Sequence, residues 1–87
     1  MGETTAIRAT IRNFLLSQFL EGQGEGALRD DQSLERSHIV DSARMLEIME
    51  FLEATFGFTV EPDDAIPDNF DTVNNIVGYV ERKKASS

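Results

Sequence analysis

The chain has 87 residues, of which 40% are hydrophobic and 28% charged, and this is the composition of one small globular domain rather than of a disordered segment. Sixteen acidic residues against eight basic ones give a net charge of −8, which repels phosphate backbones and anionic lipid and so disfavours nucleic acid and membrane surfaces as partners. The absence of cysteine excludes disulfides and zinc-thiolate sites, and with no apolar run long enough for a membrane span or a signal peptide we expect a cytoplasmic protein.

The first apolar pattern predicts a helix over residues 4–20, approximately. Its apolar side chains recur at the spacing that places them on one face of a helix. They are Ile7, Ile11, Phe14, Leu15 and Phe19. Thr4 or Thr5 can cap the start of this helix, because a hydroxyl there accepts a hydrogen bond from a first-turn N–H group. The glycines at 22, 24 and 26 end it, because a helix does not tolerate so much glycine.

A long connection over residues 22–40 separates this helix from the next. Its apolar residues are spaced irregularly, as expected of a loop that is pinned to a core. They are Leu28, Leu34, Ile39 and Val40. Residues 22–27 loosely fit a dinucleotide-binding glycine pattern, but they follow a helix and the chain has no room for a βαβ unit. His38 is the only histidine, and we expect it to be an exposed loop residue rather than a metal ligand.

The second helix is predicted over residues 42–56, opened by the Asp41-Ser42 dipeptide. One face carries four apolar residues, and three more widen it. The four are Leu46, Met49, Leu52 and Phe56, and the three are Met45, Ile48 and Phe51. This pattern predicts that Leu46 and Phe56 are buried, at a cost of about 2–5 kcal/mol when either is truncated to alanine. Gly57 is expected to end the helix in a left-handed conformation.

Two shorter elements complete the fold. Pro62 and Pro67 leave room only for a short helix at residues 66–70, and a last helix over residues 72–84 begins with Asp71 or Thr72 as its cap. This last helix carries apolar residues at helical spacing and ends in basic residues that complement its dipole. The former are Val73, Ile76, Val77 and Val80, and the latter are Arg82, Lys83 and Lys84. The predicted fold class is therefore all-α, a small four-helix bundle of three main helices plus a short third one, with residues 1–87 in a single domain.

The net charge is concentrated in one part of the chain. Residues 41–71 contain nine acidic residues and one basic residue, Arg44, whereas the acidic and basic residues of the remainder balance. A surface with this excess favours partners that present lysine and arginine patches. Four of these acids, Asp63, Asp64, Asp68 and Asp71, lack the glycine and glutamate of a calcium-binding loop, so we expect no metal site.

Asp41 and Ser42 allow two interpretations. Both residue types cap helices well, and capping is all they need to do. A serine at this place also has its hydroxyl beside unpaired N–H groups at the positive end of the helix dipole, where a phosphate ester is stabilised.

The order of these features resembles the acyl carrier protein family. The resemblance rests on a glycine-bounded first helix, a long loop, Asp41-Ser42, an acidic helix that ends Phe-Gly-Phe, a proline-bounded short helix and a final Val/Ile helix. It implies a four-helix bundle in which 4′-phosphopantetheine, derived from coenzyme A, is attached to Ser42. Together with the charge pattern it implies partner recognition by a set of residues around that serine. They are Asp41, Ala43, Arg44, Glu47, Glu50, Glu53 and Asp68.

Two residues depart from the Gly-x-Asp-Ser-Leu pattern that is common in the family. Ile39 stands in place of the glycine and Ala43 in place of the leucine. Arg44 also adds a positive charge where many members are neutral or acidic. These departures favour a dedicated pathway with its own loading enzyme over generic fatty-acid-synthase partners.

The resemblance implies a carrier and not an enzyme. Such a protein holds an acyl or aminoacyl group as a thioester on its prosthetic arm, so this cysteine-free chain needs no nucleophile of its own. Expected partners are a phosphopantetheinyl transferase, an acyl- or aminoacyl-loading ligase, and downstream acyl-processing enzymes of lipid or secondary-metabolite biosynthesis. The carrier is expected to be a monomer and a phosphoprotein. The alternative is an unmodified acidic helical domain that acts as a scaffold for a basic partner.

Overall fold

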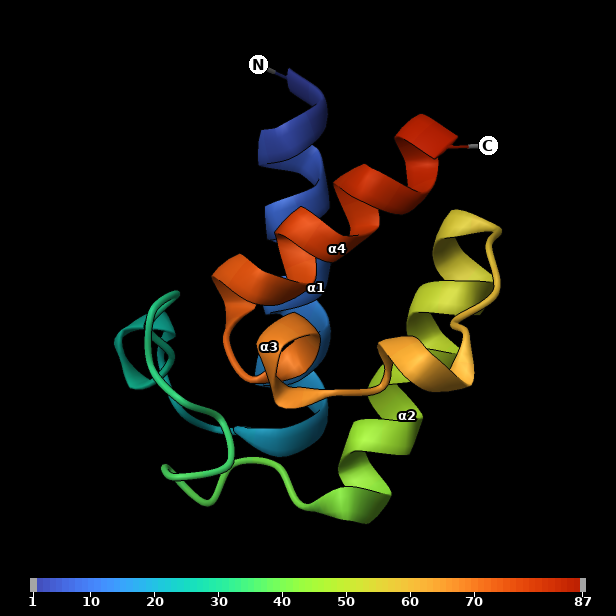
Figure 1. Cartoon of the computed structure of the whole chain (residues 1–87). Helices are drawn as coiled ribbons and strands as arrows, with labels where there is room; N and C mark the ends of the chain where they lie inside the picture. Colours follow the sequence, from blue (N-terminus) through green and yellow to red (C-terminus); the bar gives the residue numbers. More distant parts are fainter. Residues whose placement is uncertain (1, 87) are drawn as a thin grey trace.

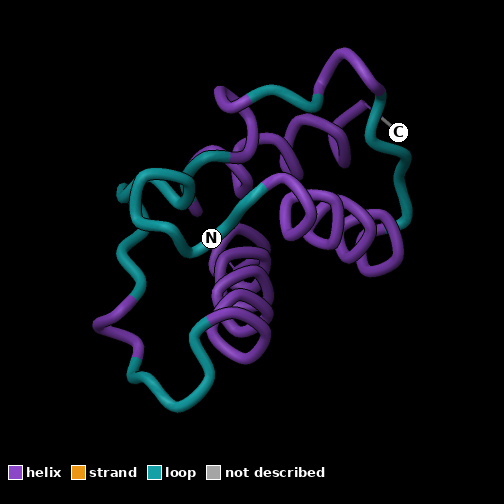
Figure 2. The backbone as a smooth tube through the Cα atoms, turned by 90° about the horizontal axis from the view of Figure 1, so that it is seen from below, coloured by secondary structure: helices purple, strands orange, loops and turns teal. Residues whose placement is uncertain are grey.

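The computed structural model describes residues 2–86, and residues 1 and 87, the two ends of the expected 1–87 domain, lie outside the described residues. This part of the chain contains four α-helices and two short 3-10 turns, with no strand (Figures 1 and 2). In chain order they are α1 (Gly2–Phe19), η1 (Glu25–Ala27), α2 (Ser42–Phe56), η2 (Pro62–Asp64), α3 (Pro67–Phe70) and α4 (Val73–Ser86). The predicted all-α class, with three main helices and a short third one, is confirmed.

The core lies where α1 and α4 pack against each other, with α3 against α4 (Figure 1). Both long helices bury residues at the expected helical spacing. In α1 these are Ile7, Ile11 and Leu15, and in α4 they are Val73, Ile76, Val77, Tyr79 and Val80. Helix α2 stands beside this pair and buries Ile48 and Leu52 against it. No helix of residues 2–86 combines the length and the apolar character that crossing a bilayer requires.

The structure confirms the predicted end of α2 but not the predicted cap at the start of α1. Helix α1 begins at Gly2, so Thr4 and Thr5 lie within it and the prediction that either one caps its start was wrong. The hydroxyl of Thr4 instead donates a hydrogen bond to Glu81 of α4. Gly57 ends α2 with φ 75° and ψ 32°, and its N–H donates to the carbonyl of Glu53, which confirms the left-handed cap.

The connection between α1 and α2 is pinned to the core, as its irregular apolar residues predicted. All four of those residues are buried: Leu28, Leu34, Ile39 and Val40. Asp30 adds a polar anchor, because its carboxylate accepts hydrogen bonds from Arg8 at 2.8 Å and from Arg12 at 2.6 Å. The backbone carbonyl of Asp30 also accepts the N–H of Asn74 at 3.0 Å. Two helices therefore hold the middle of this long connection in place.

The burial predicted for Leu46 was wrong. Its side chain is 61% exposed, and that of Ile66 is 44% exposed. Leu46 precedes the buried Ile48 by two residues, which rotates it by about 200° around the helix axis. The apolar positions of α2 cover more of its circumference than the core can contact, and the part that carries Leu46 is left at the surface.

Candidate attachment site and the pocket beside it

Ser42 is the first residue of α2, and its side chain is exposed. Asp41 caps the helix: its Oδ1 accepts the N–H of Arg44 at 2.9 Å, and its carbonyl accepts the N–H of Met45 at 2.8 Å. The N–H groups of Ser42 and Ala43 precede this first helical bond, so they face outward at the positive end of the helix dipole. The serine hydroxyl is thus approachable from solvent and lies where a negatively charged substituent is stabilised.

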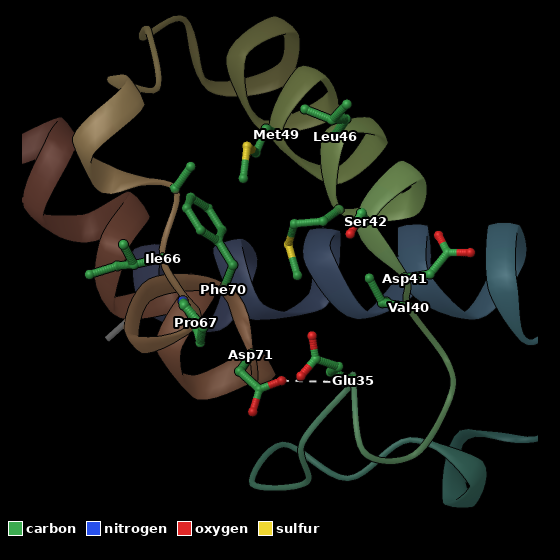
Figure 3. A pocket seen from close by; sticks show the side chains of 12 residues that line it. Glu35, Val40, Asp41, Ser42, Leu46, Met49, Ile66, Pro67, Phe70 and Asp71 are labelled. Carbon is green, nitrogen blue, oxygen red and sulfur yellow. Dashed lines mark hydrogen bonds between the residues drawn. The ribbon is translucent and has the colours of Figure 1, made fainter.

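A pocket of about 200 Å³ lies beside Ser42 (Figure 3). Helix α2 forms one wall of this pocket, and α3 with the residues that lead into it forms the other. The apolar lining comes from both walls: Met45, Leu46 and Met49 from the first, and Ile66, Pro67 and Phe70 from the second. Leu46 and Ile66 are the two large apolar side chains that stay exposed in residues 2–86, and both line this pocket. A partly apolar surface therefore begins at the candidate attachment residue.

The connection that precedes α2 lines one end of the pocket. The N–H of Glu35 donates to Oδ1 of Asp71 at 3.3 Å, and the N–H of Leu34 donates to the carbonyl of Asp71 at 2.7 Å (Figure 3). Both Glu35 and Asp71 line the pocket. Because Asp71 follows α3 directly, these bonds fix the connection against the wall opposite α2.

One face of α2 combines acidic and apolar side chains. Its residues are spaced three and four apart and all are exposed, and we call them the exposed face of α2: Ala43, Leu46, Glu47 and Glu50. The sequence reasoning assigned the alanine and both glutamates to partner recognition but missed Leu46. Leu46 can be assigned to this face only when it is known that Ile48 and Leu52 face the core. The sequence alone does not show which side of the helix is packed.

The other residues assigned to partner recognition lie in different surroundings. Asp68 is exposed in α3, and Asp41 is exposed but serves as the cap of α2. Glu53 is half-buried, and its Oε2 accepts the N–H of Val60 at 2.8 Å, so it also ties the chain after α2 back to that helix. The guanidinium of Arg44 contacts the ring of Phe19 inside the same molecule.

Within residues 2–86, no group of three or more histidine, cysteine, aspartate or glutamate side chains is placed to hold a metal ion. The residues that line the pocket beside Ser42 offer a hydroxyl, carboxylates and apolar carbons.

A curated relative decides the family. The probable acyl carrier protein PigG of Serratia sp. (strain ATCC 39006) is 32% identical to the chain over 79 residues, which cover 91% of the chain and 90% of that protein. The chain belongs to the acyl carrier protein family. No protein-family model matches it.

Membership of the acyl carrier protein family fixes the broad class of function. Members of this family are carriers and not enzymes, so the expected carrier role and the expected lack of catalysis are confirmed at the level of the family. The small helical bundle agrees with that class. Acyl carrier proteins in general carry a phosphopantetheine prosthetic group.

Proposed function

We propose that this acyl carrier protein tethers an acyl or aminoacyl group as a thioester on a 4′-phosphopantetheine arm attached to Oγ of Ser42, and presents that group to partner enzymes. The observation that carries the proposal is the exposed hydroxyl of Ser42 in the first turn of α2, directly after the Asp41 cap.

The residues around Ser42 fit the prosthetic group. A phosphodiester on Oγ would lie beside the outward N–H groups of Ser42 and Ala43, which stabilise negative charge. The pocket beside Ser42 lies open to the arm and offers apolar contacts from α2 and from Ile66. When bound, the group supplies the thiol that carries the cargo, while the protein holds the arm and is recognised by its partners.

The exposed face of α2 supports recognition by basic partners. Glu47 and Glu50 are exposed on the face that also carries Leu46, so a partner with lysine or arginine around an apolar contact would complement it. The proposed partners are a phosphopantetheinyl transferase, a loading ligase and downstream acyl-processing enzymes. A monomeric state, a cytoplasmic location and a role in lipid or secondary-metabolite biosynthesis stay predictions.

Intact-mass measurement tests the attachment residue. The protein is incubated with coenzyme A and a broad-specificity phosphopantetheinyl transferase, and we expect a mass gain of one phosphopantetheine. Ser42→Ala should abolish the gain. Ser37→Ala, which removes another exposed serine five residues earlier in the chain, should leave it unchanged. A wild-type mass that stays constant with several transferases contradicts the proposal and supports an unmodified scaffold, and a gain that survives in Ser42→Ala moves the attachment to another residue.

A further inference from the structure

Arg44 reaches from the first turn of α2 to the end of α1. Its guanidinium carbon lies 5.2 Å from the centroid of the Phe19 ring, within the distance of about 6 Å at which a cation and an aromatic face attract each other. Its Nη1 also donates to the backbone carbonyl of Ile39 at 3.3 Å. A single side chain thus joins three segments, namely α2, the end of α1 and the end of the connection between them.

The ring that Arg44 contacts is itself held in place. Phe19 packs edge-on against Phe14, with centroids 5.8 Å apart and an angle of 84° between the rings. Phe14 in turn stacks on Phe51 of α2, with centroids 3.9 Å apart. Helix α2 is therefore joined to α1 at two places. The stacking of Phe51 on Phe14 anchors the middle of the helix, and the contact of Arg44 with Phe19 anchors its first turn.

The positive charge of Arg44 is unfavourable at its position in the first turn of α2. A cation near a helix N-terminus opposes the helix dipole, and Arg44 is the one basic residue between 41 and 71. The contacts to Phe19 and Ile39 offset this unfavourable placement, and they direct the guanidinium toward the molecule's own α1.

From this geometry we propose that Arg44 is a positioning residue. It holds the first turn of α2 and the end of the preceding connection against α1, and so fixes the hydroxyl of Ser42 in the orientation that a transferase requires. This replaces the interpretation of Arg44 as a partner contact. The expected effect on phosphopantetheine transfer rests on the proposed attachment at Ser42. The ordering of the first turn of α2 by Arg44 in the unmodified protein does not.

Amide hydrogen exchange of the unmodified protein tests the positioning. We expect Arg44→Gln and Phe19→Leu each to speed exchange of the hydrogen-bonded amides of residues 39, 40, 44 and 45 by about 3- to 10-fold, while the amides of the α4 core stay protected. The double variant should exchange more slowly than the two single effects together would give, because both changes remove the contact between Arg44 and Phe19. Arg44→Lys, which keeps the cation, should fall in between. Arg36→Gln removes the same charge from another exposed side chain and should have no effect.

Transfer kinetics then separate positioning from contact with the enzyme. We expect Arg44→Gln and Phe19→Leu to lower kcat/KM for phosphopantetheine transfer by a similar factor, about 3- to 10-fold, since both reduce the fraction of molecules with Ser42 correctly placed. Slower transfer in Arg44→Gln alone, with exchange of the same four amides unchanged, would overturn the proposal and make Arg44 a partner contact. An equal loss in Arg36→Gln would also overturn it, in favour of a general charge effect. If the wild type accepts no phosphopantetheine, the proposed function fails, and the exchange experiment still decides whether Arg44 orders the first turn.

Discussion

The hydroxyl of Tyr79 in α4 donates a hydrogen bond of 2.8 Å to Oδ2 of Asp64 in η2. Asp64 also accepts the side-chain amide of Asn69 on its backbone carbonyl at 2.8 Å, and the rings of Phe58 and Phe70 both contact the Tyr79 ring. Tyr79 therefore holds the segment that precedes α3 against the last helix. That segment runs into α3, and the two together form the wall of the pocket opposite α2, so the shape of the pocket depends on a residue outside it.

Tyr79→Phe removes this hydrogen bond and keeps the ring. We expect a loss of about 1.5 kcal/mol in the free energy of unfolding, because the bond ends on a carboxylate and links segments 15 residues apart. Urea unfolding followed by circular dichroism measures the loss. A variant as stable as the wild type would show that ring packing alone holds η2 in place.

The same tyrosine predicts how stability changes at alkaline pH. Burial, together with the hydrogen bond to Asp64, raises the pKa of Tyr79 from 10.0 to about 12. The folded state therefore keeps the phenol proton over a pH range in which the unfolded state has lost it, and stability that is fully present below pH 10 is lost as the pH rises toward 12.

Because Tyr79 is the only tyrosine and the chain has no tryptophan, the ultraviolet absorbance of tyrosinate follows this titration directly. Denaturant titrations between pH 9 and 12 should show a steeper loss of stability in the wild type than in Tyr79→Phe. Equal slopes, or a phenol that titrates near 10 in the folded protein, would contradict the prediction.

Truncations in α2 test the corrected packing of this helix. Leu52 is fully buried, so Leu52→Ala should cost about 2–5 kcal/mol of unfolding free energy, whereas Leu46→Ala should change it by less than about 0.5 kcal/mol. Thermal and urea unfolding of the two variants measure both values. A large loss in Leu46→Ala would mean that this side chain is buried in solution.

The contrast between Leu46 and Gly57 shows which features the sequence can predict. The left-handed cap at Gly57 and the capping by Asp41 depend on neighbours within one turn, and both predictions were confirmed. The burial of Leu46 depends on which side of α2 meets the rest of the molecule. Periodicity predicts that a helix has an apolar face, but α2 has apolar residues around much of its circumference, and the packed side is set by tertiary contacts.

The same distinction, between features set by local neighbours and features set by tertiary contacts, applies to the candidate site. The exposure of Ser42 at a helix start follows from the local pattern. The contact of Arg44 with Phe19 joins residues 25 positions apart, and the wall opposite α2 depends on Tyr79 and Asp64. Such contacts have no periodic signature, so the sequence predicted the position of the serine but not the residues that hold its surroundings.

The polar anchor of the long connection makes a further prediction. Asp30 binds both Arg8 and Arg12, and its side chain is 32% exposed, so Asp30→Ala should cost about 1–2 kcal/mol after allowance for solvent screening. It should also speed hydrogen exchange in the connection over residues 28–40. Asp31→Ala is the matched control, because its pair with Arg29 spans 3.3 Å between side chains that are 68% and 72% exposed. A loss of the same size in both variants would assign the effect to net charge rather than to the anchor.

The acidic residues of α2 have two different roles, partner recognition and stabilisation of the fold. Reversing the charge of one residue of each kind distinguishes the two roles. Glu47 is exposed and belongs to the exposed face of α2, so Glu47→Lys should slow association with a transferase several-fold at low salt and leave the melting temperature unchanged. Glu53 accepts the N–H of Val60, so Glu53→Lys should in addition cost about 1 kcal/mol of stability. Glu53→Gln, which keeps an acceptor oxygen, should recover much of that loss. Stopped-flow association over a range of salt concentrations, set beside thermal unfolding, makes the comparison. If Glu47→Lys lowers the melting temperature as much as Glu53→Lys while association holds, Glu47 stabilises the fold and the recognition surface lies elsewhere.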